Sequence, residues 1–381
     1  MIKVSDILSG SLNKYLIDHK LSYKQKKVIN KIINCFSENS KQMHFVCSNE
    51  KCDYDEYKPQ PCRDRHCNRC NNNKKIKWLI NLLRNHLPLP YYHIVFTLPS
   101  ELNNLAICNQ KILYDIFFKS SFYVLNKFSQ DEKYFGGKLG YIGLLHTWGQ
   151  KLDYHPHLHF IVMAGGIKGN TYKKLPYQRK FIFPVLAMSK VMMGKFIELL
   201  KEKYNEGKLN FPGKLEPIEK EKDFNKYLFE LSKKSWVIYT KAPLPNSERT
   251  LEYISRYSHK VAISNGRIKS YNEGKVSFVY NDYNEEDEKG IAKRKVIKIT
   301  DIEFIRRYVL HILPEGFRKI RYGGIFSSNQ KSDAIRIIMN CIKDELKKLI
   351  EKTENLLHDF EEEVKCFCPR CNHTVLVNGY G

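Results

Sequence analysis

His155-Pro156-His157-Leu158-His159-Phe160-Ile161-Val162 is the most informative stretch of this chain. A β-strand directs successive side chains to opposite faces, so His157 and His159 would share one face while Leu158 and Phe160 enter the core. Two imidazoles on one rigid strand supply two ligands for a divalent metal, although an isolated pair of this kind is more often a surface feature. A metal site therefore requires a third ligand nearby.

We favour Gln150 as that third ligand. It lies seven residues before His157, across the turn of a hairpin that the sequence predicts between strands at residues 139–148 and 157–163. The alternatives are His93, His146 and His155. Imidazoles together with one neutral oxygen leave coordination positions open, which suits Mg²⁺ or Mn²⁺ bridging to a phosphate.

The rest of the chain mixes strand-like and helix-like segments without a regular alternation. Aromatic and β-branched residues predict further strands at residues 91–98, 236–240, 276–280 and 295–299. Apolar periodicity predicts helices at residues 5–36, 74–87, 102–128, 189–205, 223–233, 248–260, 301–313 and 332–360. Because no βαβ pattern is present, we predict an α+β protein.

The charge balance points to a polyanionic partner. The 64 Lys and Arg residues outnumber the 41 acidic residues, which leaves a net charge of +23. Neutralising phosphates with such charges releases condensed counterions, so nucleic acid is the expected partner. No apolar run is long enough for a membrane span, and the first residues do not resemble a signal peptide. We therefore expect no membrane partner and a cytoplasmic, nucleoid-associated protein.

Clustered cysteines predict structural zinc near the N-terminus. Cys47, Cys52, Cys67 and Cys70 form two short pairs, as tetrahedral Zn²⁺ coordination requires, with Cys62 and His66 as alternate ligands. Basic residues in the same stretch, among them Arg63, Arg65 and Arg69, are expected to bind DNA phosphates.

A second cysteine cluster lies near the C-terminus. Cys366, Cys368, Cys371 and His373 fall within eight residues. So tight a cluster rarely completes a tetrahedron alone, so either a second metal site or a degenerate or partner-completed one would fit. The charged helix before it could serve in self-association.

Tyr253 and Tyr257 are the candidate nucleophiles. They stand at positions i and i+4 of a predicted helix and so share one face, and Lys260 lies one turn further on. A tyrosine hydroxyl can attack a phosphodiester when a metal withdraws charge from the phosphate and a cation favours the phenolate. Taken alone, the helix would be interpreted as carrying two aromatic core residues.

Together these motifs resemble the HUH transposases of rolling-circle insertion sequences, specifically the insertion sequence ninety-one family. The resemblance covers most of the chain and rests on Cys62-Arg63-Asp64-Arg65-His66-Cys67-Asn68-Arg69-Cys70, His93-Ile94-Val95-Phe96-Thr97-Leu98-Pro99, His146-Thr147-Trp148-Gly149-Gln150, the histidine stretch, Tyr253-Ile254-Ser255-Arg256-Tyr257-Ser258-His259-Lys260 and Phe304-Ile305-Arg306-Arg307-Tyr308.

The resemblance implies a central antiparallel sheet that carries the metal ligands His157 and His159. It also implies that Tyr253 or Tyr257 nicks single-stranded DNA, leaving a 5′-phosphotyrosine and a free 3′-hydroxyl. Lys260 and Arg256 would stabilise the phenolate and the developing negative charge. The expected partners are the ends of the insertion sequence, its target DNA, and host replication or helicase proteins.

We predict three parts: a helical and zinc-binding DNA-binding domain at residues 1–87, a catalytic domain at 88–326, and a helical extension with a Cys-rich end at 327–381. Two rival functions remain: a replication initiator or relaxase with the same chemistry, and a zinc-dependent nucleic-acid-binding regulator without catalysis. The regulator explains the charge and the cysteines, but it gives no reason for the histidine and tyrosine pairs to occur together.

Overall fold

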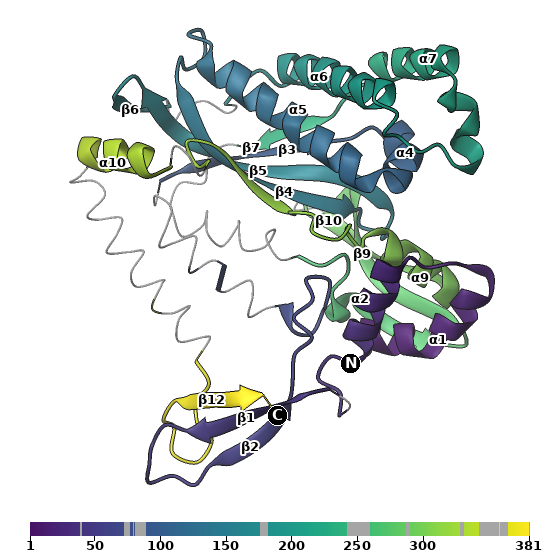
Figure 1. Cartoon of the computed structure of the whole chain (residues 1–381), viewed down its shortest axis with the longest axis vertical. Coiled ribbons are helices and arrows are strands. Elements are labelled where there is room, and N and C mark those ends of the chain that lie inside the picture. Colours follow the sequence, from purple (N-terminus) through teal and green to yellow (C-terminus); the bar gives the residue numbers. More distant parts are fainter. Residues whose placement is uncertain are drawn as a thin grey trace.

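The computed structural model describes residues 1–38, 40–71, 77–78, 80, 89–175, 182–241, 260–286, 290–327, 331–342, 358 and 365–380 (Figure 1). Helices and antiparallel sheets are mixed along the chain, so the prediction of an α+β protein is confirmed. Within these ranges, no helix has both the length and the apolar character that a bilayer crossing demands.

A central antiparallel sheet forms the body of the protein. Its strands are β3 (Tyr91–Thr97), β4 (Lys138–Trp148), β5 (Tyr154–Lys168), β6 (Thr171–Lys174), β7 (Ile238–Lys241) and β11 (Ile320–Gly324). The spatial order is β11-β4-β5-β3-β7, and β6 pairs with the far end of β5. The predicted hairpin is confirmed, because β4 and β5 pair directly.

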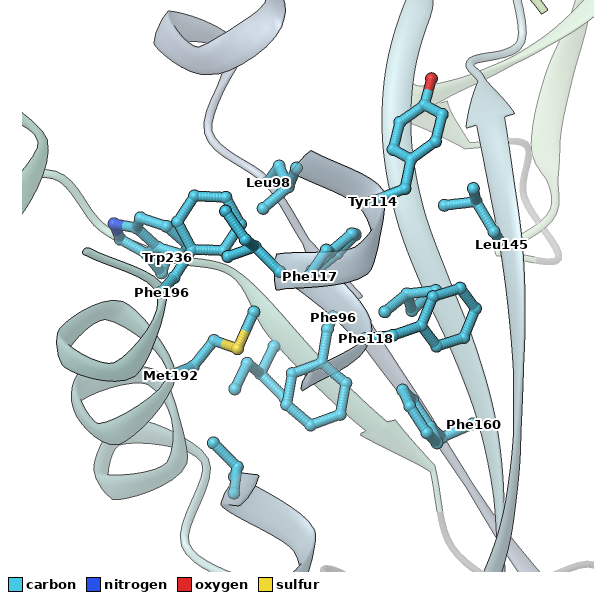
Figure 2. Close-up of a cluster of buried hydrophobic side chains, with 14 of the residues drawn as sticks. Phe96, Leu98, Tyr114, Phe117, Phe118, Leu145, Phe160, Met192, Phe196 and Trp236 are labelled. Atoms are coloured by element: carbon cyan, nitrogen blue, oxygen red, sulfur yellow. The ribbon is translucent and has the colours of Figure 1, made fainter. Parts of the chain in front are cut away.

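Helices cover one face of this sheet. They are the 3₁₀ turn η1 (Ser100–Leu102), α4 (Asn103–Cys108), α5 (Gln110–Gln130), α6 (Val185–Asn205), the 3₁₀ turn η2 (Gly213–Glu219) and α7 (Glu221–Ser232) (Figure 1). Leu158 and Phe160 enter the core beneath them, as the alternation in the sequence predicts, and the ring of Phe160 packs edge to face against Phe96 in a cluster that also contains Phe117 and Phe118 (Figure 2). Truncating one such phenylalanine to alanine typically costs about 3–5 kcal/mol, so this layer holds the sheet rigidly.

The opposite face of the sheet carries different side chains at its two ends. At one end, Tyr91, Ile142, Ile161 and Met163 pack with Ile338 of α10 (Lys331–Cys341) in a smaller apolar cluster. Toward the other end the same face carries histidines instead, because residues directly opposite one another in an antiparallel sheet share a face.

A second sheet packs with the N-terminal helices. It consists of β8 (Ile268–Asn272), β9 (Lys275–Glu286) and β10 (Ala292–Thr300), and it follows the 3₁₀ turn η3 (Asn265–Arg267). α9 (Asp301–Leu310) packs against α1 (Val4–Asp18), where Ser11 Oγ donates to buried Asp301 at 2.7 Å.

The helical stretch predicted at residues 5–36 is divided into two helices, because α1 ends at Asp18 and α2 (Tyr23–Ile33) begins separately. Ser22 caps α2: its hydroxyl accepts from the Gln25 N–H, and the Gln25 side chain accepts from the Ser22 N–H. This capping box stabilises a helix start in the middle of what the apolar periodicity presents as one continuous helix.

A third, small sheet brings the two ends of the chain together. Its order is β12-β1-β2, with β1 (Gln42–Cys47), β2 (Asp55–Pro59) and β12 (Val375–Tyr380), and Figure 1 shows β12 beside β1. The α1–α9 packing and the β1–β12 pairing cross the predicted domain boundaries near residues 87 and 327.

Candidate catalytic and metal sites

Three histidines converge on the face of the central sheet opposite α4, α5, α6 and α7. His157 and His159 lie on β5, and His146 of β4 is the direct cross-strand partner of His157. One ring nitrogen from each of the three lies within 4.8 Å of the others. His146 and His159 are buried and His157 is half-buried. Antiparallel pairing of β4 with β5 therefore positions three potential metal ligands on rigid elements; we call them the imidazole group.

Neighbouring groups orient two of these rings. The Nδ1 atom of His157 lies 2.7 Å from the carbonyl oxygen of His155, which can only accept, so Nδ1 carries the proton and Nε2 is left for a metal. The Nδ1 atom of His159 lies 2.9 Å from Nε2 of His93 on β3. A metal-bound histidine commonly donates its second ring N–H in this way, which fixes its tautomer and orientation.

The imidazole group is suited to bind a cation at neutral pH. Burial lowers the pKa of His157 to about 4, and burial also holds the pKa of His159 well below its ordinary value. Metal ligands must be deprotonated, and these imidazoles are neutral without assistance from a metal. Among the described residues, the donor set therefore fits a divalent ion.

Lys260 lies close to the imidazole group. Its positive charge contributes to the lowered pKa of both His157 and His159, and burial lowers the pKa of its own ammonium. The backbone carbonyl of Lys260 accepts a hydrogen bond from Lys319 Nζ at 3.0 Å. A cation so placed can stabilise negative charge that develops beside the histidines.

Gln150, the third metal ligand favoured from the sequence, has hydrogen-bond partners on β9 and at Arg267. Its side-chain oxygen accepts from the Asn281 N–H and its amide nitrogen donates to the Tyr283 hydroxyl, both at 3.4 Å. Its carbonyl accepts from the guanidinium of Arg267. Gln150 thus ties the β4–β5 turn to β9. His146, which the sequence left as an alternative, has a ring nitrogen within 4.8 Å of those of His157 and His159.

Eight of the cysteines form two groups, whereas the sequence predicted one N-terminal set and left a second, C-terminal metal site open. Cys35, Cys62, Cys67 and Cys70 make one group, and Cys47, Cys52, Cys368 and Cys371 make the other. The expected set of Cys47, Cys52, Cys67 and Cys70 is therefore divided, with one pair in each group. Cys62, expected only as an alternate, joins the first group.

The distances fit tetrahedral zinc. Within the first group the Sγ atoms of Cys62 and Cys70 are 3.6 Å apart, and in the second group Cys52 and Cys368 are 3.7 Å apart. Four sulfurs at the usual zinc–sulfur distance would stand about 3.8 Å from one another. The Arg69 N–H points to Cys67 Sγ at 3.4 Å, which supports a thiolate there.

The other alternate zinc ligand, His66, has both ring nitrogens engaged. Nδ1 lies 2.7 Å from an Asp64 carboxylate oxygen, and Nε2 accepts from the Leu313 N–H at 3.2 Å. The Tyr308 hydroxyl also donates to the His66 carbonyl at 3.0 Å. His66 therefore joins the first cysteine group to the segment after α9, and the four thiols leave no need for it as a ligand.

The predicted DNA-binding arginines occupy different environments. Arg65 donates to the carbonyls of Phe317 and Pro314, and Arg69 donates to the carbonyl of Cys35. Arg63 is exposed, with a positive φ of 53°. Arg65 and Arg69 thus brace the segment that holds the first cysteine group.

Tyr253, Arg256 and Tyr257 lie outside the described residues, so the predicted nucleophiles are known here from the sequence alone. Lys260 is the first described residue after them.

Sequence reasoning missed Cys35 and the contact between His93 and His159. Cys35 stands 27 residues before Cys62, which is farther than the spacing within a zinc knuckle. The signal that could have revealed it is the odd number of cysteines between Cys47 and Cys70, because five cysteines leave Cys62 without a neighbour in a short pair. His93 was considered only as a metal ligand. Its actual place, one strand away from His159, follows from the β3–β5 pairing.

Comparisons with known proteins show two transposase family models and two curated relatives. The family model described as "Putative transposase" matches residues 140–333, which contain the whole imidazole group, and the model described as "Transposase zinc-binding domain" matches residues 7–98. "Putative transposase y4qJ" of Sinorhizobium fredii is 33% identical over 334 residues, which are 87% of this chain and 82% of the relative.

"Transposase for insertion sequence element IS801" of Pseudomonas savastanoi pv. phaseolicola is 27% identical over 310 residues, which are 79% of this chain and 70% of the relative. No solved structure matches the chain.

Proposed function

This chain belongs to the family of transposases with the insertion sequence ninety-one type of zinc-binding domain, and from that premise we propose that it cuts and rejoins single-stranded DNA with a tyrosine nucleophile. The observation that carries the proposal is the convergence of His146, His157 and His159, with Lys260 near enough for its charge to lower the pKa of His157 and His159. Such a group combines a cation site with a fixed positive charge, as phosphoryl transfer requires.

His146, His157 and His159 would hold the divalent ion. When bound, the ion would polarise a non-bridging oxygen of the scissile phosphate. Three imidazoles without a neutral oxygen favour Mn²⁺ over Mg²⁺, because affinity for nitrogen ligands is higher for transition metals than for the harder Mg²⁺. Of the two ions expected from the sequence, Mg²⁺ and Mn²⁺, this set of ligands therefore favours Mn²⁺.

Tyr257 or Tyr253 would supply the nucleophile. Tyr257 precedes Lys260 by three residues, and three residues of chain span at most about 11 Å, so covalent geometry alone keeps it near the cation. The phenolate oxygen attacks phosphorus, the bond from phosphorus to the 3′-oxygen breaks, and that oxygen leaves as a 3′-hydroxyl after taking a proton. The products are a 5′-phosphotyrosine and a free 3′-hydroxyl.

Rejoining would reverse this step with a different 3′-hydroxyl. That hydroxyl attacks the phosphotyrosine, the bond between phosphorus and the tyrosine oxygen breaks, and a phosphodiester forms. The number of phosphoester bonds stays constant, so joining requires no nucleotide cofactor. A second tyrosine would let one active site hold one DNA end while it cuts another.

The test uses single-stranded oligonucleotides tiled across both strands of the DNA that flanks the coding region. With purified full-length protein and Mn²⁺, a 3′-labelled oligonucleotide should give a labelled protein band that survives SDS, and a 5′-labelled one a shortened free fragment. A non-catalytic regulator would bind these oligonucleotides and leave them uncut.

A matched pair of variants completes the test. His157→Ala combined with His159→Ala should abolish the adduct, whereas Cys108→Ser, at an exposed thiol on α4, should leave it unchanged. Addition of a second oligonucleotide with a free 3′-hydroxyl should give a joined product, which separates strand transfer from nicking at an origin. Cutting without any protein-linked DNA would overturn the proposal.

A further inference from the structure

The second cysteine group joins the two ends of the chain. Cys47 ends β1 and Cys52 follows it, whereas Cys368 and Cys371 come just before β12. β1 and β12 pair antiparallel with Cys47 opposite Val375, and the Ser48 N–H donates to the Thr374 carbonyl at 2.9 Å. More than three hundred residues of chain separate the two halves of the group.

Each half is folded as a metal-binding knuckle. The Asn49 N–H points to Cys47 Sγ and the Arg370 N–H to Cys368 Sγ, both at 3.4 Å. The turn after Cys368 closes through an Asn372 N–H to Cys368 carbonyl bond of 2.9 Å, and Asn372 itself adopts a positive φ of 60°. Backbone N–H groups directed at sulfur stabilise negative thiolates, which are the form that binds zinc.

The group has the dimensions of a metal site and not of disulfides. Cys47 Sγ lies 3.4 Å from Cys371 Sγ, and Cys52 Sγ lies 3.7 Å from Cys368 Sγ. A disulfide bond is about 2.05 Å long, whereas sulfurs around one zinc stand about 3.8 Å apart. Both cross-pairs connect the N-terminal half of the group to the C-terminal half.

The small sheet around this group lacks an apolar core of its own. The clusters of buried apolar residues found in the described ranges take no member from β1, β2 or β12. Phe367, Leu376 and Val377 are each more than two-fifths exposed. Three short strands with so little buried apolar surface are not stable alone, and natural domains of this size depend on a metal or on disulfides.

We infer that Cys47, Cys52, Cys368 and Cys371 bind a second structural zinc ion, which fastens residues 365–380 to the N-terminal zinc-binding domain. Cys368 and Cys371 lie outside both ranges matched by the family models, 7–98 and 140–333. The first cysteine group packs instead against the core of α1, α2 and α9, with Cys35 and Cys67 fully buried. One ion would therefore stabilise the packing around α1, α2 and α9, and the other would hold the two ends of the chain together. This inference does not depend on the proposed DNA chemistry.

The test measures zinc per chain in the purified full-length protein by inductively coupled plasma mass spectrometry. The wild type should hold two zinc ions. Cys368→Ser combined with Cys371→Ser should hold one, and so should Cys67→Ser combined with Cys70→Ser. Cys366→Ser is the matched control, because this exposed thiol lies two residues from Cys368 but outside the group, and it should keep two.

A second readout follows the C-terminal segment itself. In the Cys368→Ser and Cys371→Ser protein, trypsin should cleave after Lys365 and Arg370 at least tenfold faster than in the wild type, while cleavage outside this cysteine group stays unchanged. The inference is overturned if that protein keeps two zinc ions, or if the wild type holds only one. Should the variant fail to fold, cadmium-113 spectra of the wild type still decide: two signals in the four-sulfur range support the inference and one overturns it.

Discussion

The rings of His93 and His159 lie edge to edge and nearly parallel, with centroids 5.1 Å apart and with His93 Nε2 at 2.9 Å from His159 Nδ1. Burial lowers the pKa of His93 to about 3, so its ring is neutral at physiological pH. A neutral His93 can accept the Nδ1 proton of His159, which leaves Nε2 of His159 to bind the metal. His93 is thus a positioning residue for one ligand.

Replacing His93 should weaken metal binding without removing it. Loss of such an outer hydrogen bond typically lowers metal affinity about 10–100-fold, and we expect this for His93→Ala. His93→Gln should recover much of the affinity, because its amide oxygen can accept the same proton. Nicking activity measured against Mn²⁺ concentration separates the two explanations. Weaker metal binding raises the half-saturating Mn²⁺ concentration, whereas a general loss of folding lowers the activity at every concentration.

His146 and Gln150 give a direct comparison of the two candidates for the third ligand. His146→Ala should lower Mn²⁺ affinity at least 100-fold, because it removes one of three ligands from a rigid sheet. Gln150→Ala should leave the affinity within about threefold of wild type, since Gln150 contacts Asn281 and Tyr283 instead. Isothermal titration with Mn²⁺ measures both, and the reverse order would restore Gln150 as the ligand.

Tyr239 is placed to stack on an unpaired base. It lies opposite Val95, which lies opposite His159, so all three share the face of the imidazole group. Its side chain is 56% exposed. Stacking of a base on an aromatic side chain is worth about 1–3 kcal/mol, so Tyr239→Ala should weaken binding of single-stranded DNA roughly 5–150-fold. Fluorescence anisotropy checks this, with Tyr239→Trp as a variant that keeps the affinity.

His311 should make the stability of the protein depend on pH. Its Nδ1 contacts the Thr147 hydroxyl at 3.1 Å, its Nε2 lies 3.2 Å from the Leu152 carbonyl, and burial lowers its pKa to about 4. The unfolded chain, with an ordinary histidine pKa of about 6.5, takes up the proton first as pH falls. The stabilising effect of neutral His311 is therefore complete above pH 6.5 and is lost as pH falls toward 4.

Between pH 7.5 and pH 5 this loss amounts to about 2 kcal/mol in the free energy of unfolding. In His311→Gln the decline over the same range should be smaller by about that amount, and urea unfolding at the two pH values measures it. An equal decline in both proteins would show that His311 already titrates normally in the folded state.

The local patterns in the sequence predicted the central sheet well. Alternation in β5 placed His157 and His159 on one face and Leu158 in the core, because strand geometry fixes those directions residue by residue. The same pattern could not rank Gln150 against His146. That choice depends on the register of β4 against β5 and on the bulge between His146 and Trp148, which puts His146 opposite His157.

The two cysteine groups could not be predicted from local spacing in the sequence. Knuckle spacing revealed the pairs Cys47 with Cys52 and Cys67 with Cys70, but spacing says nothing about which pairs share an ion. Cys35 lies at the end of a helix, and the partners of Cys47 lie at the far end of the chain. Only the long-range pairing of β1 with β12 brings those partners together.

The central claim is that a tyrosine just before Lys260 becomes linked to DNA, and peptide mapping of the covalent adduct tests it most directly. Trypsin cuts after Arg249, Arg256 and Lys260, so Tyr253 and Tyr257 fall in different peptides, residues 250–256 and 257–260. After nuclease digestion, mass spectrometry should find a nucleotide phosphate on one or both peptides, and none in the Tyr253→Phe, Tyr257→Phe double variant. A nucleotide on any other peptide, or an adduct that survives in the double variant, would contradict the account.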